Sequence, residues 1–346
     1  MRAVRVERPS AQKSDLNGRV LCHELRGDDG RVAIAKGRVL DDEDCARALT
    51  LDWSELHLLA LDDGDVHEDD AGDRIARAVA GDGVGRRDPS GGHWPLVATV
   101  RGLLSVDPAA LDRINSLEGP CVYSLYDHQV VDAGEVVART KIIPFAVAAR
   151  VLAEVDEISA DAGGAIRVRP FVTHRIGAVV HESMGDRAVA RFRTAVAEKV
   201  RWFGSSLCAV EVTPPSVDGI VRSFEAVSQA GAQIALVAGT KAMDVLDPTF
   251  TALERLGARM VRHGVPAHPG SLLWIADWNG IAVVGMPTCG LFAQATVFDL
   301  VIARLLTGEQ LSSASLAGLG HGGFLTRDMA FRLPAYRAAT ERGAVE

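Results

Sequence analysis

The residues best suited to chemistry follow the apolar run AQIALVAG, residues 232–239, where Gly239, Thr240 and Lys241 stand in succession. A glycine lets the backbone approach a ligand closely, a threonine offers a hydroxyl, and a lysine offers a cation. This combination suits a small anion held at the point where a strand ends and a helix begins. The sequence therefore predicts an anion-binding loop at these three residues.

Two carboxylates, Asp244 and Asp247, extend the same loop. Asp247 stands directly before Pro248, and proline is favoured at the first position of a helix. We therefore expect Asp247 to cap the helix that begins at Pro248. The loop matches neither the Gly-x-x-x-x-Gly-Lys-Ser/Thr phosphate loop nor the Gly-x-Gly-x-x-Gly dinucleotide fingerprint.

Other candidate ligand contacts lie in loops that follow predicted strands. Such loops converge at one edge of a parallel sheet, which is where ligands bind in open α/β folds. Cys289 in one of them is either a soft ligand or redox group, or a small buried residue at a helix start. The candidates outside residues 239–241 are Ser183, Thr213, Pro269, Gly270, Ser271, Pro287, Thr288 and Cys289.

Several of these candidates bracket a predicted β-hairpin, HPGSLLWIADWNGIAVVGMPTCG, residues 268–290. Its Asn279-Gly280 pair predicts a type I′ turn, with Leu272–Ile275 paired against Ile281–Val284 as the core. We expect the two ends of the hairpin to lie beside the predicted anion loop. His268 is equally compatible with a phosphate contact and with a solvent-facing position.

Strand and helix patterns must position these residues, and from about residue 165 they alternate regularly. That alternation predicts βαβ units and a three-layer α/β/α domain with a mainly parallel sheet, preceded by an N-terminal α+β domain. A long helix is expected over residues 291–308, with Asp299 and Arg304 exposed or ion-paired. The predicted organisation is a flexible tail at 1–16, the α+β domain at 17–160, the α/β domain at 165–330, and a C-terminal tail at 331–346.

The overall composition is ordinary for a globular protein, with 48% apolar and 24% charged residues. No apolar run approaches the roughly 20 residues of a membrane-spanning helix, and the five cysteines are widely separated. We therefore expect a cytoplasmic protein without a membrane partner. The net charge is −8, and its excess of acidic residues lies in the first half. This argues against a nucleic-acid partner.

The order of parts in the second half resembles the molybdopterin-binding domain shared by molybdopterin adenylyltransferases and molybdopterin molybdotransferases. The resemblance is carried by ALVAGTKAMDVLDPTFTALERLGARMVRHGVPAHPGSLLWIADWNGIAVVGMPTCGLF. The first half is similar to molybdopterin-binding proteins fused to a nucleotidyltransferase domain, through LDDGDVHEDDAGDRIA, VRGLLSVDPAALDRIN and VVARTKIIPFAV. The resemblance implies a pterin phosphate bound at the strand ends, with molybdenum on its dithiolene, and a homo-oligomeric protein.

The chain departs from the transferases of that family. They carry a Thr-Gly-Gly-Thr-Gly loop and two aspartates for Mg-ATP chemistry, whereas this chain keeps Gly239 followed by Thr240-Lys241. Asp244 matches the later aspartate, which makes it the catalytic candidate. The Pro-Gly-Asn-Pro of the molybdotransferases is replaced by Pro-Thr-Cys-Gly at residues 287–290.

Three functions are compatible with this pattern. The first is a protein that binds molybdopterin or the molybdenum cofactor during its biosynthesis, processing or delivery to a molybdoenzyme client. The second is an active molybdopterin adenylyl- or molybdo-transferase, which requires Mg²⁺ held by a carboxylate pair. The third is a regulatory or partner-binding module that has kept the fold and lost the ligand.

Overall fold

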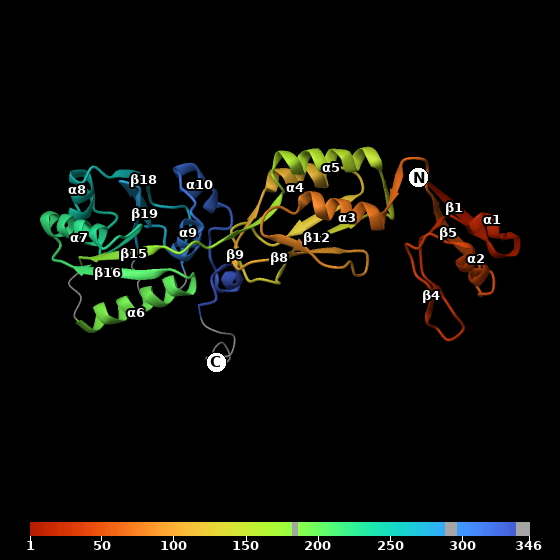
Figure 1. Ribbon diagram of the computed structural model, residues 1–346, viewed down its shortest axis with the longest axis horizontal. Coiled ribbons are helices and arrows are strands. Elements are labelled where there is room, and N and C mark those ends of the chain that lie inside the picture. Colours follow the sequence, from red (N-terminus) through yellow and green to blue (C-terminus); the bar gives the residue numbers. More distant parts are fainter. Residues whose placement is uncertain (182–185, 288–295, 337–346) are drawn as a thin grey trace. The chain divides into compact units, whose positions relative to one another are not determined.

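The computed structural model describes residues 1–181, 186–287 and 296–336. The chain divides into two compact units, and each is described by itself (Figure 1). Unit 1 comprises residues 1–100, 104–127 and 132–168, and unit 2 comprises residues 101–103, 128–131 and 169–346. The predicted domain boundary between residues 160 and 165 stays a prediction.

Unit 1 begins with a small antiparallel sheet in the order β1-β5-β2. The predicted flexible tail at residues 1–16 is wrong. Arg2–Glu7 pairs with β5, and Leu16 is fully buried in the cluster beneath this sheet. The alternating sequence RAVRVE buries Val6 and exposes its charges, as an edge strand does. The elements are β1 Arg2–Glu7, η1 Arg8–Ser10, α1 Lys13–Leu16, β2 Val20–Leu21, β3 Leu25–Arg26, β4 Val32–Ile34, α2 Asp42–Ala48 and β5 Glu55–Ala60.

The rest of unit 1 combines an antiparallel sheet, in the order β10-β12-β8-β7, with three helices. The sheet and the helices together form the α+β arrangement expected for the first half of the chain. Its elements are β6 Asp65–His67, α3 Glu68–Val79, β7 Val84–Arg86, β8 Trp94–Ala98, α4 Pro108–Asn115, β10 Pro120–Ser124, β12 Val136–Ile142, β13 Ala146–Ala148 and α5 Ala149–Asp161. Three further strands are not confined to unit 1: β11 Val130–Val131 belongs to unit 2, and β9 Gly102–Val106 and β14 Ile166–Pro170 have residues assigned to each unit.

Unit 2 is built on a six-stranded sheet in the order β16-β15-β17-β20-β19-β18. The first four strands in this order run parallel to one another, while β19 runs antiparallel to both of its neighbours. With helices between the strands, the protein has the expected mixed α/β character. The strands are β15 Arg175–Val180, β16 Ser206–Val212, β17 Ile234–Ala238, β18 Arg259–His263, β19 Trp274–Trp278 and β20 Ile281–Gly285.

Both faces of this sheet are covered. In β15, Ala178 and Val180 pack into the cluster that holds α6 (Asp186–Trp202) and α9 (Val297–Leu305). Val179 points to the other face, where it joins α7 (Val217–Gln229) and α8 (Pro248–Arg255). Figure 1 shows α6 and α7 on opposite sides of β15 and β16. None of the described helices is long and apolar enough to cross a membrane.

The C-terminal part of unit 2 corrects two expectations and decides between two alternatives for a third. Within the described residues, α9 starts only at Val297, because Thr296 caps it and accepts the N–H of Phe298. Asp299 and Arg304, expected to be exposed or ion-paired, are buried and ion-paired, with Lys199 and Glu309 respectively. The predicted tail at 331–346 is also wrong for its described part, where Tyr336 donates to Asp299 at 2.6 Å. The remaining elements are α10 Ser313–Ala317, η3 Gly318–Gly320 and η4 Arg327–Arg332.

Candidate functional site

The strand register of unit 2 brings the predicted loops to one edge of the sheet. Val180 pairs with both Val212 and Ala238, and Val237 pairs with Gly285. The strands β15, β16, β17 and β20 therefore end side by side. The residues that follow them directly are His181, Thr213, Gly239 and Met286. We refer to this side of the sheet as the C-terminal edge.

The hairpin contributes both of its ends to the C-terminal edge. Its turn is as predicted, with φ angles of 51° at Asn279 and 82° at Gly280. The paired strands differ from the prediction, because β19 begins at Trp274, and Trp274 pairs with Gly285. A side chain at Gly270 would meet Pro287, so the entry and exit of the hairpin are in contact.

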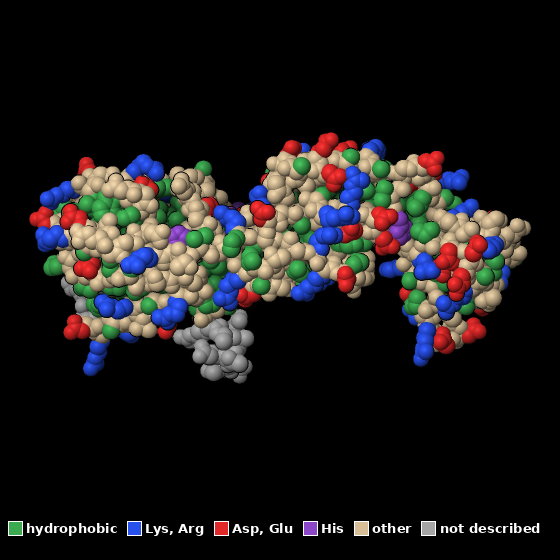
Figure 2. Space-filling view, viewed as in Figure 1, with side chains coloured by type: hydrophobic (Ala, Val, Ile, Leu, Met, Phe, Trp, Pro, Cys, Tyr) green, Lys and Arg blue, Asp and Glu red, His purple; other side chains and the backbone are tan. Residues whose placement is uncertain are grey.

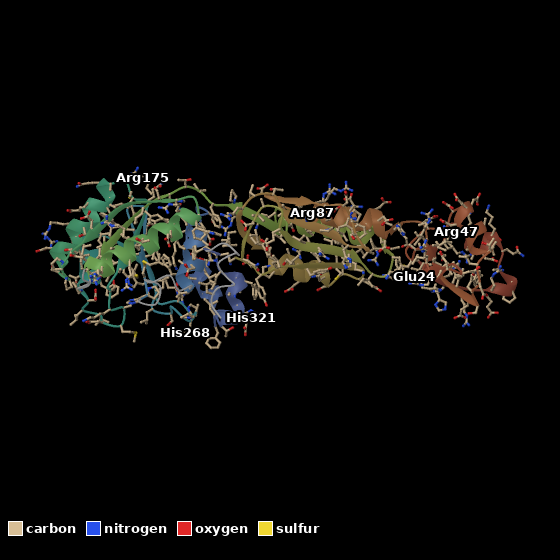
Figure 3. All side chains as sticks on the ribbon, turned by 90° about the horizontal axis from the view of Figure 1, so that it is seen from below. Glu24, Arg47, Arg87, Arg175, His268 and His321 are labelled. Atoms are coloured by element: carbon tan, nitrogen blue, oxygen red, sulfur yellow. The ribbon has the colours of Figure 1, made fainter. Side chains whose placement is uncertain are left out.

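His268 precedes this entry and is exposed, with its ring stacked on Phe324 at a centroid distance of 6.5 Å. Figure 3 shows His268 and Arg175, the first residue of β15, on opposite sides of unit 2. The exposed position of His268 fits the solvent-facing interpretation.

The loop after β17 is held in a defined shape by Asp247. Its carboxylate accepts the backbone N–H of Lys241 at 2.8 Å and that of Thr249 at 2.9 Å. The expected helix cap is therefore present, and it extends to the start of the loop. The N–H of Lys241 is therefore already used and does not serve an anion.

The donors that remain belong to Gly239 and Thr240. Their backbone N–H groups make no hydrogen bond to any other residue that the structure describes. Gly239 has a φ of 106°, a conformation that favours glycine and turns the chain sharply at the end of the strand. Thr240 is half-buried and Lys241 is exposed. These two amides, one hydroxyl and one ammonium group make the loop suitable for an anion.

Two candidate residues that contact this loop, His181 and Thr249, were not predicted from the sequence. His181 Nε2 lies 2.8 Å from the hydroxyl of Thr249 and 3.3 Å from that of Thr240. The two hydroxyls are 3.1 Å apart. The one sequence signal for this cluster is the position of His181 directly after a buried strand. Its contact with Thr249 gives no local signal, because the two residues are 68 positions apart.

Asp247 supplies the charge of this cluster. Burial alone would raise the pKa of its carboxyl, but hydrogen bonds from Thr249 and Lys241 and the nearby His181 together lower the pKa below the ordinary value. Asp247 is 3% exposed. It is thus a buried and fully engaged carboxylate, which stabilises the loop rather than facing a ligand.

The other carboxylates do not form a pair with Asp247. Asp244 is exposed and accepts the N–H of Leu246, two residues along the same loop. Asp218 forms an ion pair with Arg255 at 2.5 Å. No group of three or more His, Cys, Asp or Glu suited to a metal ion occurs in the described parts of the chain. The described residues therefore do not fit the Mg²⁺ site that a transferase mechanism requires.

The remaining predicted residues are placed as follows. Thr213 lies at the C-terminal edge against Gly219 of α7, while Ser271 is exposed. Pro269 accepts the N–H of Val297, which joins the hairpin entry to the start of α9. Ser183, Thr288 and Cys289 lie outside the described residues.

The surface near the loop is mixed in character. Figure 2 shows acidic and basic side chains interspersed over the visible faces of both units. The tip of the loop presents three apolar side chains, Met243, Val245 and Leu246, which are 80%, 84% and 83% exposed. The loop thus combines a polar base at the sheet edge with an apolar tip in solvent.

In the comparison with known proteins, the matches are to solved structures. No protein family model matches the chain, and no curated protein sequence matches it. Among solved structures, it is similar to a molybdopterin biosynthesis MoeA protein from Pyrococcus horikosii, with 12% identity, a TM-score of 0.30, and coverage of 70% of this chain and 79% of that one.

Two further solved structures are similar to it at 12% identity. A molybdenum cofactor biosynthesis protein from Pyrococcus furiosus has a TM-score of 0.25, with coverage of 89% of this chain and 65% of that one. A putative molybdenum cofactor biosynthesis protein from Corynebacterium diphtheriae has a TM-score of 0.27, with coverage of 44% of this chain and 100% of that one. Superpositions at these TM-scores do not establish a common fold, so the function must be argued from the residues of this chain.

Proposed function

We propose that this protein binds the phosphate-bearing pterin of the molybdenum cofactor and acts in the biosynthesis, processing or delivery of that cofactor. The observation that carries the proposal is the pair of backbone amides at Gly239 and Thr240, which bond to no other residue in the described part of the chain. They lie at the edge where four strands end, beside the exposed cation of Lys241. An oxyanion bound there would receive two backbone donors and one charged donor.

The rest of the proposed site follows from the same edge. The hairpin entry at Pro269-Gly270 and its exit at Pro287 are in contact, and they border the strand next to β17. We assign the phosphate to residues 239–241 and the pterin ring to the hairpin ends. This arrangement agrees with the resemblance of the sequence to the three-layer α/β/α molybdopterin-binding domain.

Binding and delivery are favoured over group transfer by the state of the carboxylates. Asp247 is used as a helix cap, and Asp218 is paired with Arg255. Of the two carboxylates in the loop, Asp244 is the exposed one. A single carboxylate does not provide the pair of ligands that a Mg²⁺-dependent transferase needs. The proposed client is a molybdoenzyme, and the proposed setting is the cytoplasm.

The test is retention of the pterin by purified protein. Native protein incubated with molybdenum cofactor, desalted and oxidised should release the characteristic pterin fluorescence. Replacing Lys241 with alanine should weaken retention about tenfold, which corresponds to the loss of about 1.4 kcal/mol of binding free energy. Lys36→Ala, which removes an exposed cation in unit 1, is the matched control and should retain the pterin fully. Absence of pterin from the native protein would overturn the proposal and leave a partner-binding module.

Transferase activity is the second candidate, because Asp244 is exposed in the same loop. It predicts turnover of molybdopterin that depends on Mg-ATP or molybdate. Asp244→Asn should then abolish turnover while pterin retention is unchanged. Turnover that is independent of Mg-ATP and molybdate would exclude this candidate.

A further inference from the structure

Three polar atoms from different segments meet beneath the proposed phosphate loop. His181 follows β15, Thr240 follows β17, and Thr249 lies in the first turn of α8. The atoms His181 Nε2, Thr249 Oγ1 and Thr240 Oγ1 are 2.8, 3.1 and 3.3 Å from one another. All three distances permit hydrogen bonds, so the cluster is a small connected network.

Burial decides which member of the network can reach a ligand. Thr249 is 0% exposed and His181 is 2% exposed. Thr240 is half-buried, and it adjoins Gly239, whose amide bonds to no other residue that the structure describes. Only the hydroxyl of Thr240 is therefore placed to contact a ligand, whereas His181 and Thr249 act on it from within.

Which group donates in each of these hydrogen bonds depends on the group that Thr240 contacts. A phosphate dianion only accepts hydrogen bonds, so the hydroxyl of Thr240 must donate to it. Its oxygen is then free to accept from Thr249, and the oxygen of Thr249 can accept from His181 Nε2–H. Without the ligand, the hydroxyl of Thr249 has an alternative acceptor in Asp247. The cluster thus permits two arrangements of its hydrogen bonds, in which Thr249 donates either to Thr240 or to Asp247. A bound phosphate selects the first.

We infer that His181 and Thr249 are positioning residues for the phosphate of the ligand, and that a donor chain from His181 through Thr249 fixes the hydroxyl of Thr240 toward it. This inference rests on the proposed function and specifies how the same site recognises its ligand. It predicts that the protein binds a phosphate monoester more tightly than the corresponding alcohol. Neither His181 nor Thr249 needs to touch the ligand for this effect.

The probes are the fluorescent oxidation product of molybdopterin with its phosphate monoester, and the same compound after removal of that phosphate. Native protein should bind the phosphorylated probe at least tenfold more tightly. Thr249→Val keeps the shape of the side chain but removes the hydroxyl, and should abolish most of that preference. Thr249→Ser should restore it, because serine keeps the hydroxyl. Thr251→Val, an exposed position on the same helix, is the matched control.

A second variant guards against misfolding at the buried position. His181→Gln keeps a side-chain donor and should preserve part of the preference, whereas His181→Leu should lose it. If native protein binds neither probe, the proposed function fails, and this inference fails with it. If native protein prefers the phosphorylated probe and folded Thr249→Val and His181→Leu keep the full preference, only the positioning chain is overturned.

Discussion

The carboxylate of Asp247 accepts the backbone N–H of Lys241 at 2.8 Å and so closes the loop that follows β17. The same carboxylate caps α8 through the N–H of Thr249. One buried side chain therefore fixes both ends of the segment between the sheet and the helix. The shape of the proposed site depends on this carboxylate even though it does not face the ligand.

Replacing Asp247 with alanine should lower the free energy of unfolding by about 2 kcal/mol, because it removes a helix cap and leaves a loop amide unsatisfied. Urea denaturation of the purified protein measures this loss. Asp244→Ala is the control, since Asp244 is exposed and bonds only within its own loop. Its effect should stay within about 0.5 kcal/mol. Equal losses in the two variants would contradict this role of Asp247.

The contribution of Asp247 should also depend on pH. Its folded-state pKa is lowered, so the folded protein binds the proton less tightly than the unfolded chain does. The stabilisation is therefore present above the ordinary aspartate pKa of about 3.9 and is lost as the pH falls through the folded value. The difference between native protein and Asp247→Ala should be constant from pH 6 to 8 and shrink in acid. A difference that grows in acid would contradict the assignment.

Replacing Gly270, at the hairpin entry, should lower the stability of the protein. Gly270 has a φ of 111°, and a Cβ there would lie 2.6 Å from Val297 Cγ1. Gly270→Ala should cost about 2–3 kcal/mol of stability, from backbone strain together with the clash. Gly280→Ala at the hairpin turn is the control, because its φ of 82° adds strain but no contact lies within 4 Å. Thermal unfolding should rank the two variants in that order.

Local sequence patterns were enough to predict that the loops after the strands meet at one edge of the sheet, and to predict the turn of the hairpin. The Asn279-Gly280 pair determines its turn through backbone preferences alone. His181 and Thr249 could not be predicted together, because their contact depends on how β15 and α8 pack. Burial of Asp299 was missed for a similar reason. Its charge suggests a surface position, and its burial is made favourable by Lys199 and Tyr336, which both lie far from it in the sequence.

The stability of unit 1 should respond to pH through Glu68. This residue is buried at the start of α3, and burial raises its pKa, although His67, Lys141 and Lys36 oppose that rise and Asp69 adds to it. The folded state therefore binds the proton more tightly than the unfolded chain. The stabilisation is full below the ordinary glutamate pKa of about 4.3 and is lost as the pH rises through the folded value.

Glu68→Gln tests this sign directly. The amide resembles the protonated acid and carries no charge, so the variant should be more stable than native protein at pH 7 and similar to it near pH 4. Urea midpoints at the two pH values give the comparison. Asp69→Asn, at the exposed neighbouring position, is the matched control and should show no such gain. A Glu68→Gln protein that is less stable at pH 7 would contradict the proposed desolvation.

The buried ion pair of Lys199 and Asp299 should be far more sensitive to substitution than a surface pair. Their side chains are 6% and 0% exposed, and their charged atoms are 2.7 Å apart. Lys199→Met leaves the Asp299 charge buried without its cation and should cost about 3–5 kcal/mol. Arg255→Met breaks the exposed pair with Asp218 and should cost less than about 1 kcal/mol. Because Tyr336 also donates to Asp299, Tyr336→Phe should cost an intermediate amount, about 1–3 kcal/mol.

Urea denaturation measures the free energy of unfolding of the three variants. The interpretation would be contradicted if Lys199→Met lowered that free energy no more than Arg255→Met does.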